Sequence, residues 1–319
     1  MKLFRLAGIM SLGTLLVCAT LAHAETRVTY KSAKTSSSYY QMAVQIAEAI
    51  KAGTNGDIIV TVEESQGSVQ NVKEVMVRTG NYVFTTPPAL IKLAQESGGK
   101  FETDDPAKYM TVRSLFPIPS LTMHFVVRKD SGIKTFDDLD GKTMLIGKGS
   151  FGAKEAANYF SLFGLDGKVK LANVELGSAV EALKNRQIDG FATSGSYPAP
   201  NVIEAAAGTG INLLSLSPEQ IKLTKRTELQ IPAGTYPGVD YPVNTTSLPV
   251  VAYTTTEMAD ETAYQLTKAF WEQKEKMAQS NPWWGGVTPA MLANIQGQLH
   301  PGALRYYQER GFAIPEAIR

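Results

Sequence analysis

The stretch TMLIGKGSFGAKEAANYFSLF, residues 143–163, joins an apolar run at 143–146, a glycine loop at 147–152 and a helix-like run from Ala153 onward. This order predicts a strand, a loop and a helix, which is the repeating unit of α/β folds. The loop has the spacing G-x-G-x-x-G. Glu175 lies at the end of the next strand-like run, residues 169–176, at about the 20-residue offset seen in dinucleotide-binding units. The loop therefore has two interpretations, a dinucleotide site or a site for another anion at a helix N-terminus.

The same order of elements occurs twice before this stretch. Each strand-like run is followed by a polar loop and then by a helix-like run with apolar residues at helical spacing. The expected strands are 27–31, 58–62 and 82–85, and the expected helices are 39–52 and 69–79. Alternation of this kind predicts a mostly parallel sheet covered by helices.

Residues 100–120 break this alternation with two proline-containing turns, and a long strand-like run at 121–128 follows. A second long run lies at 248–254. We interpret both runs as strands that cross between two α/β lobes, and we expect hinge motion in the crossing strands near 117–121 and 248–251. The expected division is a leader at 1–24, lobe I at 25–120 plus 255–319, and lobe II at 121–254.

The first 24 residues have the pattern of a secretory signal peptide. Lys2 and Arg5 precede an apolar core at 6–21, and Ala22-His23-Ala24 closes it. This pattern predicts export to the periplasm with cleavage after Ala24. A lipid anchor on Cys18 is disfavoured, because a bulky valine precedes that cysteine.

The composition narrows the function. The chain has 31 Lys and Arg against 30 Asp and Glu, without a basic block, so we expect no nucleic-acid partner. Beyond the leader there is no cysteine, and the histidines are His124 and His300, which excludes cysteine and multi-histidine metal sites. No G-x-S-x-G elbow or other catalytic constellation occurs. We therefore expect no enzyme activity, no cofactor and no metal, and we prefer solute binding over a dinucleotide site.

Several short motifs match one family in order and spacing along nearly the whole mature chain. They are Tyr39-Tyr40 after a polar turn, Gln66-Gly67-Ser68-Val69-Gln70-Asn71, Val127 to Ile133, Ala182 to Phe191, Tyr197-Pro198-Ala199-Pro200, Ile231 to Tyr236, and Leu299-His300-Pro301-Gly302-Ala303 before Tyr306-Tyr307. The sequence resembles the TAXI-type solute-binding proteins of TRAP transporters. The resemblance implies a two-lobed α/β periplasmic binding protein fold, type II-like. It also implies a monomeric receptor that closes on a small, usually acidic solute and delivers it to an ion-coupled membrane permease.

We expect the ligand beyond the carboxyl ends of the parallel strands, where loops open into helix N-termini. The candidate ligand-binding residues are Lys34, Thr35, Ser36, Ser38, Tyr39, Gly67, Ser68, Asn71, Thr86, Pro87, Ser150, Phe151, Gly152, Ala153, Ser194, Tyr197 and Tyr236. The first loop, residues 34–38, carries a lysine and serines where the family has glycines, so Lys34 is the first candidate for a charge on the ligand and Lys148 the second. A ligand carboxylate is predicted to accept hydrogen bonds from backbone N–H groups at 150–153, with Gly152 allowing its close approach.

Two questions stay open at this point. The small-molecule carboxylate ligand is either amino-acid-like or a dicarboxylate. The receptor could also serve an ABC permease or a sensor kinase, which use the same fold, and a periplasmic enzyme acting on a small acid is the less favoured alternative.

Overall fold

The computed structural model describes residues 25–147 and 150–319. The expected leader with Cys18, and Lys148 of the glycine loop, lie outside the described residues. The strands are β1 (Thr26–Lys31), β2 (Ile58–Glu63), β3 (Tyr82–Thr86), β4 (Val112–Arg128), β5 (Thr143–Leu145), β6 (Lys170–Ala172), β7 (Gly190–Gly195), β8 (Ile211–Leu213), β9 (Thr227–Ile231) and β10 (Val243–Thr255). The α-helices are α1 (Ser38–Gly53), α2 (Ser68–Lys73), α3 (Pro88–Gln95), α4 (Pro106–Tyr109), α5 (Phe151–Leu162), α6 (Ala179–Lys184), α7 (Pro200–Thr209), α8 (Pro218–Thr224), α9 (Asp260–Ser280) and α10 (Pro301–Glu309).

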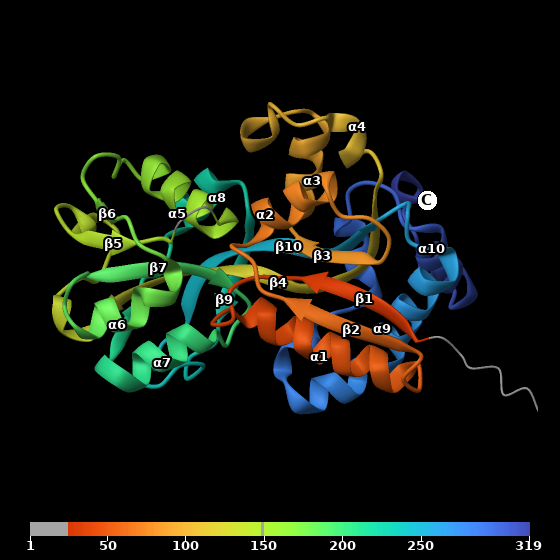
Figure 1. The fold of residues 1–319 in the computed structure, drawn as a ribbon. Coiled ribbons are helices and arrows are strands. Elements are labelled where there is room, and N and C mark those ends of the chain that lie inside the picture. The colour runs from red at the N-terminus through yellow and green to blue at the C-terminus, as the bar shows by residue number, and fades with distance from the viewer. Residues whose placement is uncertain (1–24, 148–149) are drawn as a thin grey trace, which may run out of the picture.

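The strands form one mixed sheet that spans two lobes (Figure 1). Its order is β2-β1-β3-β10-β4-β7-β5-β6, with β8 beside β4 and β9 beside β10. Strand β1 is parallel to β2 and β3, and β5 is parallel to β6 and β7. Each lobe therefore contains a parallel α/β unit, and the predicted two-lobed α/β fold is confirmed.

The first lobe folds as its apolar spacing predicts. Met42, Ile46 and Ile50 lie on one face of α1 and are at most 2% exposed. Helix α1 begins at Ser38 because Ser37 caps it, accepting a hydrogen bond from the Tyr40 N–H at 3.4 Å. Helices α1 and α9 pack together below the sheet in Figure 1, and α2, α3 and α4 lie above it.

The second lobe holds the glycine loop. Helix α5 follows the loop but begins at Phe151, two residues earlier than expected, because Ser150 caps it. Strand β6 covers three residues, Lys170–Ala172, whereas the sequence predicted a strand over 169–176. The strand is short because residues 173 to 175 leave the ladder and a 3₁₀ turn, Leu176–Ser178, follows. The strand-loop-helix order is nevertheless present as predicted.

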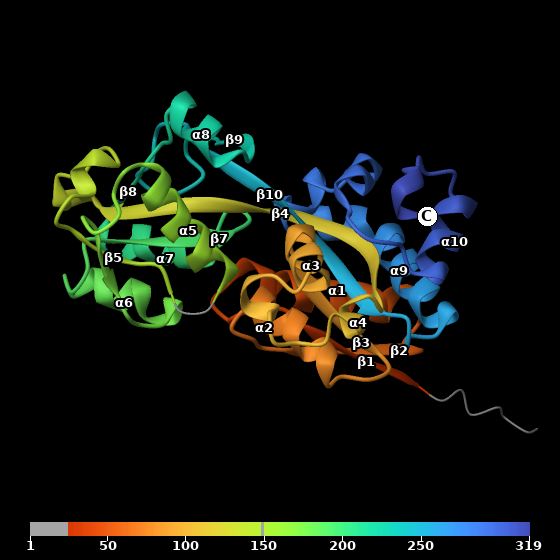
Figure 2. The same ribbon diagram turned by 90° about the horizontal axis from the view of Figure 1, so that it is seen from above.

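Strands β4 and β10 are the crossing strands, and Figure 2 shows them running from one lobe into the other. Strand β4 begins at Val112, nine residues before the expected start, although it contains Pro117 and Pro119. The antiparallel register slips between the pairs Leu121–Leu248 and Ile118–Val250. Pro119 lies in this irregularity, where the missing N–H breaks no regular ladder bond. The expected proline-containing turn at 117–119 is therefore wrong, because these residues lie inside strand β4.

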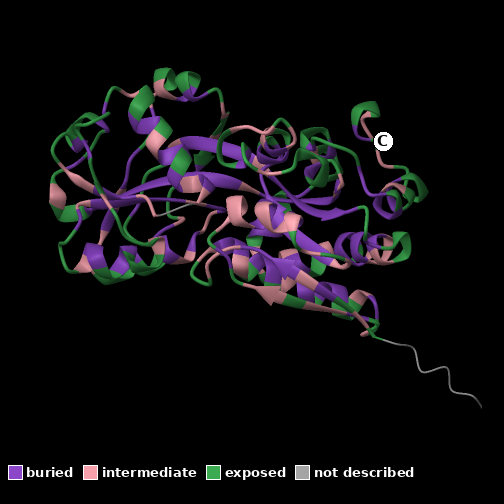
Figure 3. Cartoon of the chain, turned by 45° about the horizontal axis from the view of Figure 1, so that its top comes forward, coloured by how far each residue is buried: buried purple, intermediate pink, exposed green. Residues whose placement is uncertain are grey.

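The buried residues follow the strands and the inner helix faces, as the purple core in Figure 3 shows. Strand β10 pairs with β3 through Val251, Ala252 and Tyr253, so it has already entered the first lobe's sheet before the expected boundary at 254. Trp284 is fully buried and Trp283 is 6% exposed, so both pack into the core. No helix among residues 25–147 and 150–319 is long and apolar enough to cross a membrane.

Candidate functional site

A cleft lies between the two lobes at the carboxyl ends of the parallel strands. Its cavity measures about 70 Å³. Predicted residues that line it are Lys34, Tyr39, Gly67, Ser68, Pro87, Ser150, Phe151, Gly152 and Ser194. They come from both lobes and from loops far apart in the chain, as the strand-end rule predicts. We refer to this cavity as the cleft.

The lobes touch each other across the cleft. Gly67 follows β2 in the first lobe and Ser150 precedes α5 in the second. A Cβ atom built on Gly67 would lie 3.5 Å from the Ser150 Cβ. Gly67 also has φ +113°, a backbone conformation that side-chain-bearing residues rarely adopt. The two lobes therefore come close to contact here, so the structure represents a closed arrangement, while the positive φ accounts for glycine at 67.

The N-terminus of α5 forms part of the cleft wall. The Ser150 Oγ accepts a hydrogen bond from the Ala153 N–H at 3.0 Å, so this N–H group is already used. The N–H groups of Phe151 and Gly152 have no acceptor inside the helix, because the first turn of a helix lacks preceding carbonyls. The part of the predicted anion site that remains open is therefore Phe151 and Gly152, together with the Ser150 hydroxyl hydrogen.

The reason for glycine at 152 differs from the predicted one. A Cβ atom on Gly152 would lie 1.9 Å from the Ser194 Oγ and 2.8 Å from the Ser194 Cβ. Close packing of α5 against the end of β7 therefore requires glycine whether or not a ligand is present. A larger residue at 152 would collide with Ser194 before it met a ligand, so such a variant does not test ligand approach alone.

The first loop supplies fewer cleft residues than expected. Lys34 lines the cleft, its side chain is 28% exposed, and its Nζ lies 3.8 Å from the Glu64 Oε1. The Thr35 N–H donates to the same carboxylate at 3.4 Å, while the Thr35 and Ser36 side chains are exposed and do not line the cavity. Lys34 therefore already has one anionic neighbour, Glu64. Because Lys34 also lines the cleft, a ligand carboxylate is a candidate for the second.

Several predicted residues lie beneath the cleft and hold its floor. Asn71 is fully buried, and its Nδ2 donates to the carbonyls of Ser32 at 2.7 Å and Thr85 at 2.9 Å, which joins the ends of β1 and β3. Thr86 is also fully buried. Ala153 is 8% exposed, and its backbone N–H is held by the cap. These side chains shape the cleft from behind and do not line it.

Ser38 and Tyr39 connect the lobes at the base of the cleft. The Ser38 Oγ accepts a hydrogen bond from the Ser196 N–H at 3.1 Å, and the Ser196 Oγ donates to the Ser120 carbonyl at 2.7 Å. The Tyr39 hydroxyl donates to the Pro119 carbonyl at 3.0 Å. Burial raises the pKa of Tyr39 far above its usual range, so this hydroxyl stays a donor.

Tyr197 and Tyr236 lie away from the cleft. Tyr197 lines a second cavity, on the other face of the crossing strands. Tyr236 is 1% exposed, and its hydroxyl contacts the Ala199 N–H and the His124 Nε2, each at 2.8 Å. The sequence placed both near a ligand because they follow strands or turns, but their rings point into other parts of the second lobe.

The cleft also contains residues that the sequence did not nominate. Gln66, Thr85, Leu176 and Glu175 line it. Glu175 is exposed, and Lys34 and Glu175 are the charged side chains on the described part of the cleft wall. The spacing of Glu175 after the glycine loop predicts a cleft position for it, but in the Sequence analysis only as part of a dinucleotide site.

The comparisons with known proteins agree with this architecture. A family model described as the NMT1-like family matches residues 31–311. The periplasmic binding protein BugD is 12% identical, with a TM-score of 0.57 over 91% of this chain and 99% of its own. An ancestral arginine-binding protein is 15% identical, with a TM-score of 0.51 over 82% of this chain and 99% of its own.

A protein from Bordetella bronchiseptica RB50 is 17% identical, with a TM-score of 0.50 over 92% of this chain and 86% of its own. At these identities the structural matches establish the fold alone. The family model covers most of the sequence, from the end of β1 to the residues after α10. The chain therefore has the two-lobed fold of periplasmic solute-binding proteins, and it belongs to the NMT1-like family.

Proposed function

We propose that this protein is an extracytoplasmic solute receptor that binds a small organic acid between its lobes and delivers it to a membrane permease. The observation that carries this proposal is the closed cleft itself, in which Gly67 of one lobe meets Ser150 of the other. A cavity between two lobes that are joined by two crossing strands suits capture of a solute by hinge closure. Family membership and the TAXI resemblance support the same reading.

The donors on the cleft wall favour a carboxylate. Phe151 and Gly152 offer backbone N–H groups at the positive end of α5, and Lys34 supplies a positive charge from the opposite lobe. The Ser68 and Ser194 hydroxyls also line the cavity. We infer that one ligand carboxylate lies between the α5 N-terminus and Lys34.

Glu175 favours an amino-acid-like ligand over a dicarboxylate. Its carboxylate lines the same cavity as Lys34 and would repel a second negative group on the ligand, whereas it would attract an ammonium group. The cavity of about 70 Å³ has space for about five water-sized groups, since each needs about 10–15 Å³ in this measure. A small zwitterion fits both the charge and the size. One structural neighbour, the ancestral arginine-binding protein, is described as bound to an amino acid.

We infer the partner and the compartment from the sequence. The resemblance to TAXI-type proteins points to a TRAP permease and a monomeric receptor, and the leader pattern points to a periplasmic protein that begins at Glu25. N-terminal sequencing of the exported protein tests the cleavage site. A large multi-spanning permease gene beside this one supports the TRAP partner, whereas an adjacent ATPase gene would favour an ABC permease.

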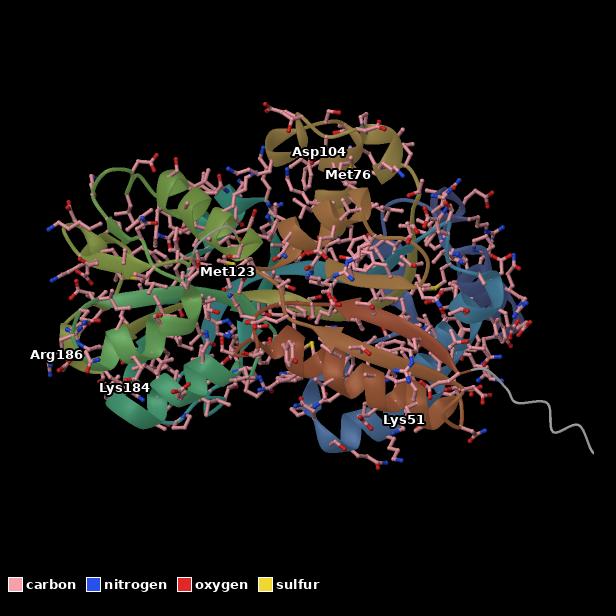
Figure 4. All side chains as sticks on the ribbon, viewed as in Figure 1. Lys51, Met76, Asp104, Met123, Lys184 and Arg186 are labelled. Carbon is pink, nitrogen blue, oxygen red and sulfur yellow. The ribbon has the colours of Figure 1, made fainter. Side chains whose placement is uncertain are left out.

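Thermal shift with paired ligands tests the binding proposal. We expect L-alanine to raise the melting temperature more than propionate and malonate, because only the amino acid carries an ammonium group for Glu175 and malonate adds a second carboxylate. Glu175→Gln should reduce the amino-acid shifts. Glu181→Gln is the matched control, since Glu181 pairs with Lys184 at 3.0 Å on the outer side of the second lobe, where Figure 4 labels Lys184.

Two results would contradict parts of this proposal separately. If malonate stabilises the protein as well as L-alanine does, and Glu175→Gln changes neither shift, the role of Glu175 is wrong while the receptor stands. If neutral or cationic solutes alone raise the melting temperature, the carboxylate site at α5 is wrong.

A further inference from the structure

A second cavity, which we call the hinge groove, lies on the other face of strand β4. It measures about 570 Å³. Ser120 and Thr122 line the hinge groove, whereas Leu121 between them lines the cleft. Side chains of a strand alternate between its faces, so β4 separates the two cavities. The hinge groove is thus distinct from the proposed solute site.

Both lobes contribute walls to the hinge groove. Tyr197 and Pro198 come from the loop after β7, and Trp283 comes from the 3₁₀ turn Pro282–Gly286 that follows α9. The Trp283 Nε1–H donates a hydrogen bond to the Pro198 carbonyl at 3.2 Å. The groove therefore lies where segments far apart in the sequence meet behind the crossing strands.

The lining of the hinge groove is uncharged and partly aromatic. Among the described residues, every side chain that lines it is apolar, aromatic or a hydroxyl. A charged molecule would lose its hydration there without gaining a countercharge. Tyr197 is half-buried and Trp283 is buried, so the accessible aromatic surface of the groove comes mainly from Tyr197, with Trp283 packed beside it. An aromatic wall suits a planar, largely apolar group.

Two hydroxyls in the hinge groove lack partners within the part of the chain that the structure describes. Thr122 is 1% exposed and Ser247 is 8% exposed, and neither side-chain oxygen makes a hydrogen bond to another described residue. Thr122 and Ser247 both line the groove, so a molecule in the groove is the nearest further partner for their hydroxyls. Buried polar groups are normally paired, which marks these hydroxyls as available to a bound molecule.

We propose that the hinge groove is a second small-molecule site, for an uncharged aromatic alcohol or a similarly flat molecule that carries a hydroxyl or carbonyl group. Its volume lies within the range of about 300–1,000 Å³ typical of ligand pockets. The aromatic part packs against Trp283 and Tyr197, and the polar group bonds to Thr122 and Ser247. Because both lobes form its walls, a bound molecule also biases the opening of the cleft.

A pair of glycine variants separates this site from the rest of the surface. Gly286 lines the hinge groove and Gly285 does not, yet both are exposed and a Cβ atom on either would meet no other atom within 4 Å. Gly286→Leu should therefore fill the groove without straining the fold, and Gly285→Leu is the matched control. Equal melting temperatures of the two variants check that neither perturbs folding.

Benzyl alcohol is the probe, with benzoate and benzylamine as charged analogues of the same ring. Titrations followed by saturation-transfer-difference NMR should show benzyl alcohol binding to the wild type and to Gly285→Leu, and at least about ten-fold weaker binding to Gly286→Leu. Both charged analogues should bind more weakly than the alcohol to the wild type. Thr122→Val, which keeps the side-chain shape, should weaken the alcohol while leaving the melting temperature unchanged.

The proposal is overturned if benzyl alcohol gives no signal with the wild type at millimolar concentration. It is also overturned if Gly286→Leu binds the alcohol as well as Gly285→Leu does. Equal binding of benzoate and benzyl alcohol to the wild type would refute the assignment to uncharged molecules.

Discussion

The stability of this protein should depend on pH through His124, on crossing strand β4 next to Met123, which Figure 4 labels where the lobes meet. His124 is 2% exposed. Its Nδ1 lies 3.1 Å from the Thr122 carbonyl, and its Nε2 lies 2.8 Å from the Tyr236 hydroxyl. A carbonyl only accepts, so Nδ1 carries the proton of the neutral imidazole, and Nε2 accepts from the Tyr236 hydroxyl, which itself accepts from the Ala199 N–H. This arrangement requires a neutral imidazole with its proton on Nδ1.

Burial lowers the pKa of His124 from 6.5 to about 4. Above pH 6.5 the imidazole is neutral in both the folded and the unfolded chain, so it adds no pH dependence there. As the pH falls from 6.5 toward 4, His124 binds a proton in the unfolded chain but not in the folded chain, which favours unfolding. At about 1.4 kcal/mol per pH unit, the free energy of unfolding should fall by about 2 kcal/mol between pH 8 and pH 5.

Urea denaturation of the wild type and of His124→Gln at pH 8 and pH 5 measures this effect. Carboxylates titrate in both proteins, so their contribution cancels in the comparison. We expect the wild type to lose about 2 kcal/mol more than the variant on acidification. Equal losses in the two proteins would refute the assignment of this pH dependence to His124.

Three further predictions concern the cleft. Lys34→Ala should weaken the binding of a carboxylate ligand by about 1.5–3 kcal/mol in calorimetry. Lys51→Ala, a change at an exposed position of α1, should leave the affinity unchanged. Equal affinities of the two variants would mean that Lys34 pairs with Glu64 alone. Gly152→Ala should cost about 1–3 kcal/mol of stability by collision with Ser194, and adding Ser194→Gly should restore much of it; a double variant as unstable as the single one would contradict the packing argument. Small-angle scattering should give a smaller radius of gyration with ligand than without, and no change at saturation would count against hinge closure.

The sequence predicted the architecture because its signals are local. Apolar spacing identifies α1, and the order strand, loop, helix implies parallel strands whose carboxyl ends share one edge of a sheet. That geometric consequence brings Lys34, Ser68 and Ser150 to one cleft, although each follows a different strand. Their convergence could therefore be inferred without knowledge of any side-chain contact.

Side-chain direction could not be inferred in the same way. Ser194 lines the cleft, but Tyr197, three residues later, lines the hinge groove on the other face of β4. Asn71 follows a strand and a loop as Ser68 does, yet it turns inward and ties β1 to β3. These directions depend on turns and on packing between distant segments, which spacing along the chain does not encode.

The glycine loop shows why a motif alone left the ligand undecided. Strands β5 and β6 are parallel neighbours, so a loop after the first and an acidic residue after the second must approach each other, as in a dinucleotide-binding unit. Gly147, Gly152 and Glu175 do line one cavity. The opposite lobe decides what that cavity can hold, because Gly67 meets Ser150 and leaves about 70 Å³, well below the roughly 300–1,000 Å³ of larger ligand pockets. The glycine loop alone thus does not decide between the two kinds of site. The opposite wall of the cavity decides, because it limits the size of the ligand, and it belongs to a segment some eighty residues away in sequence.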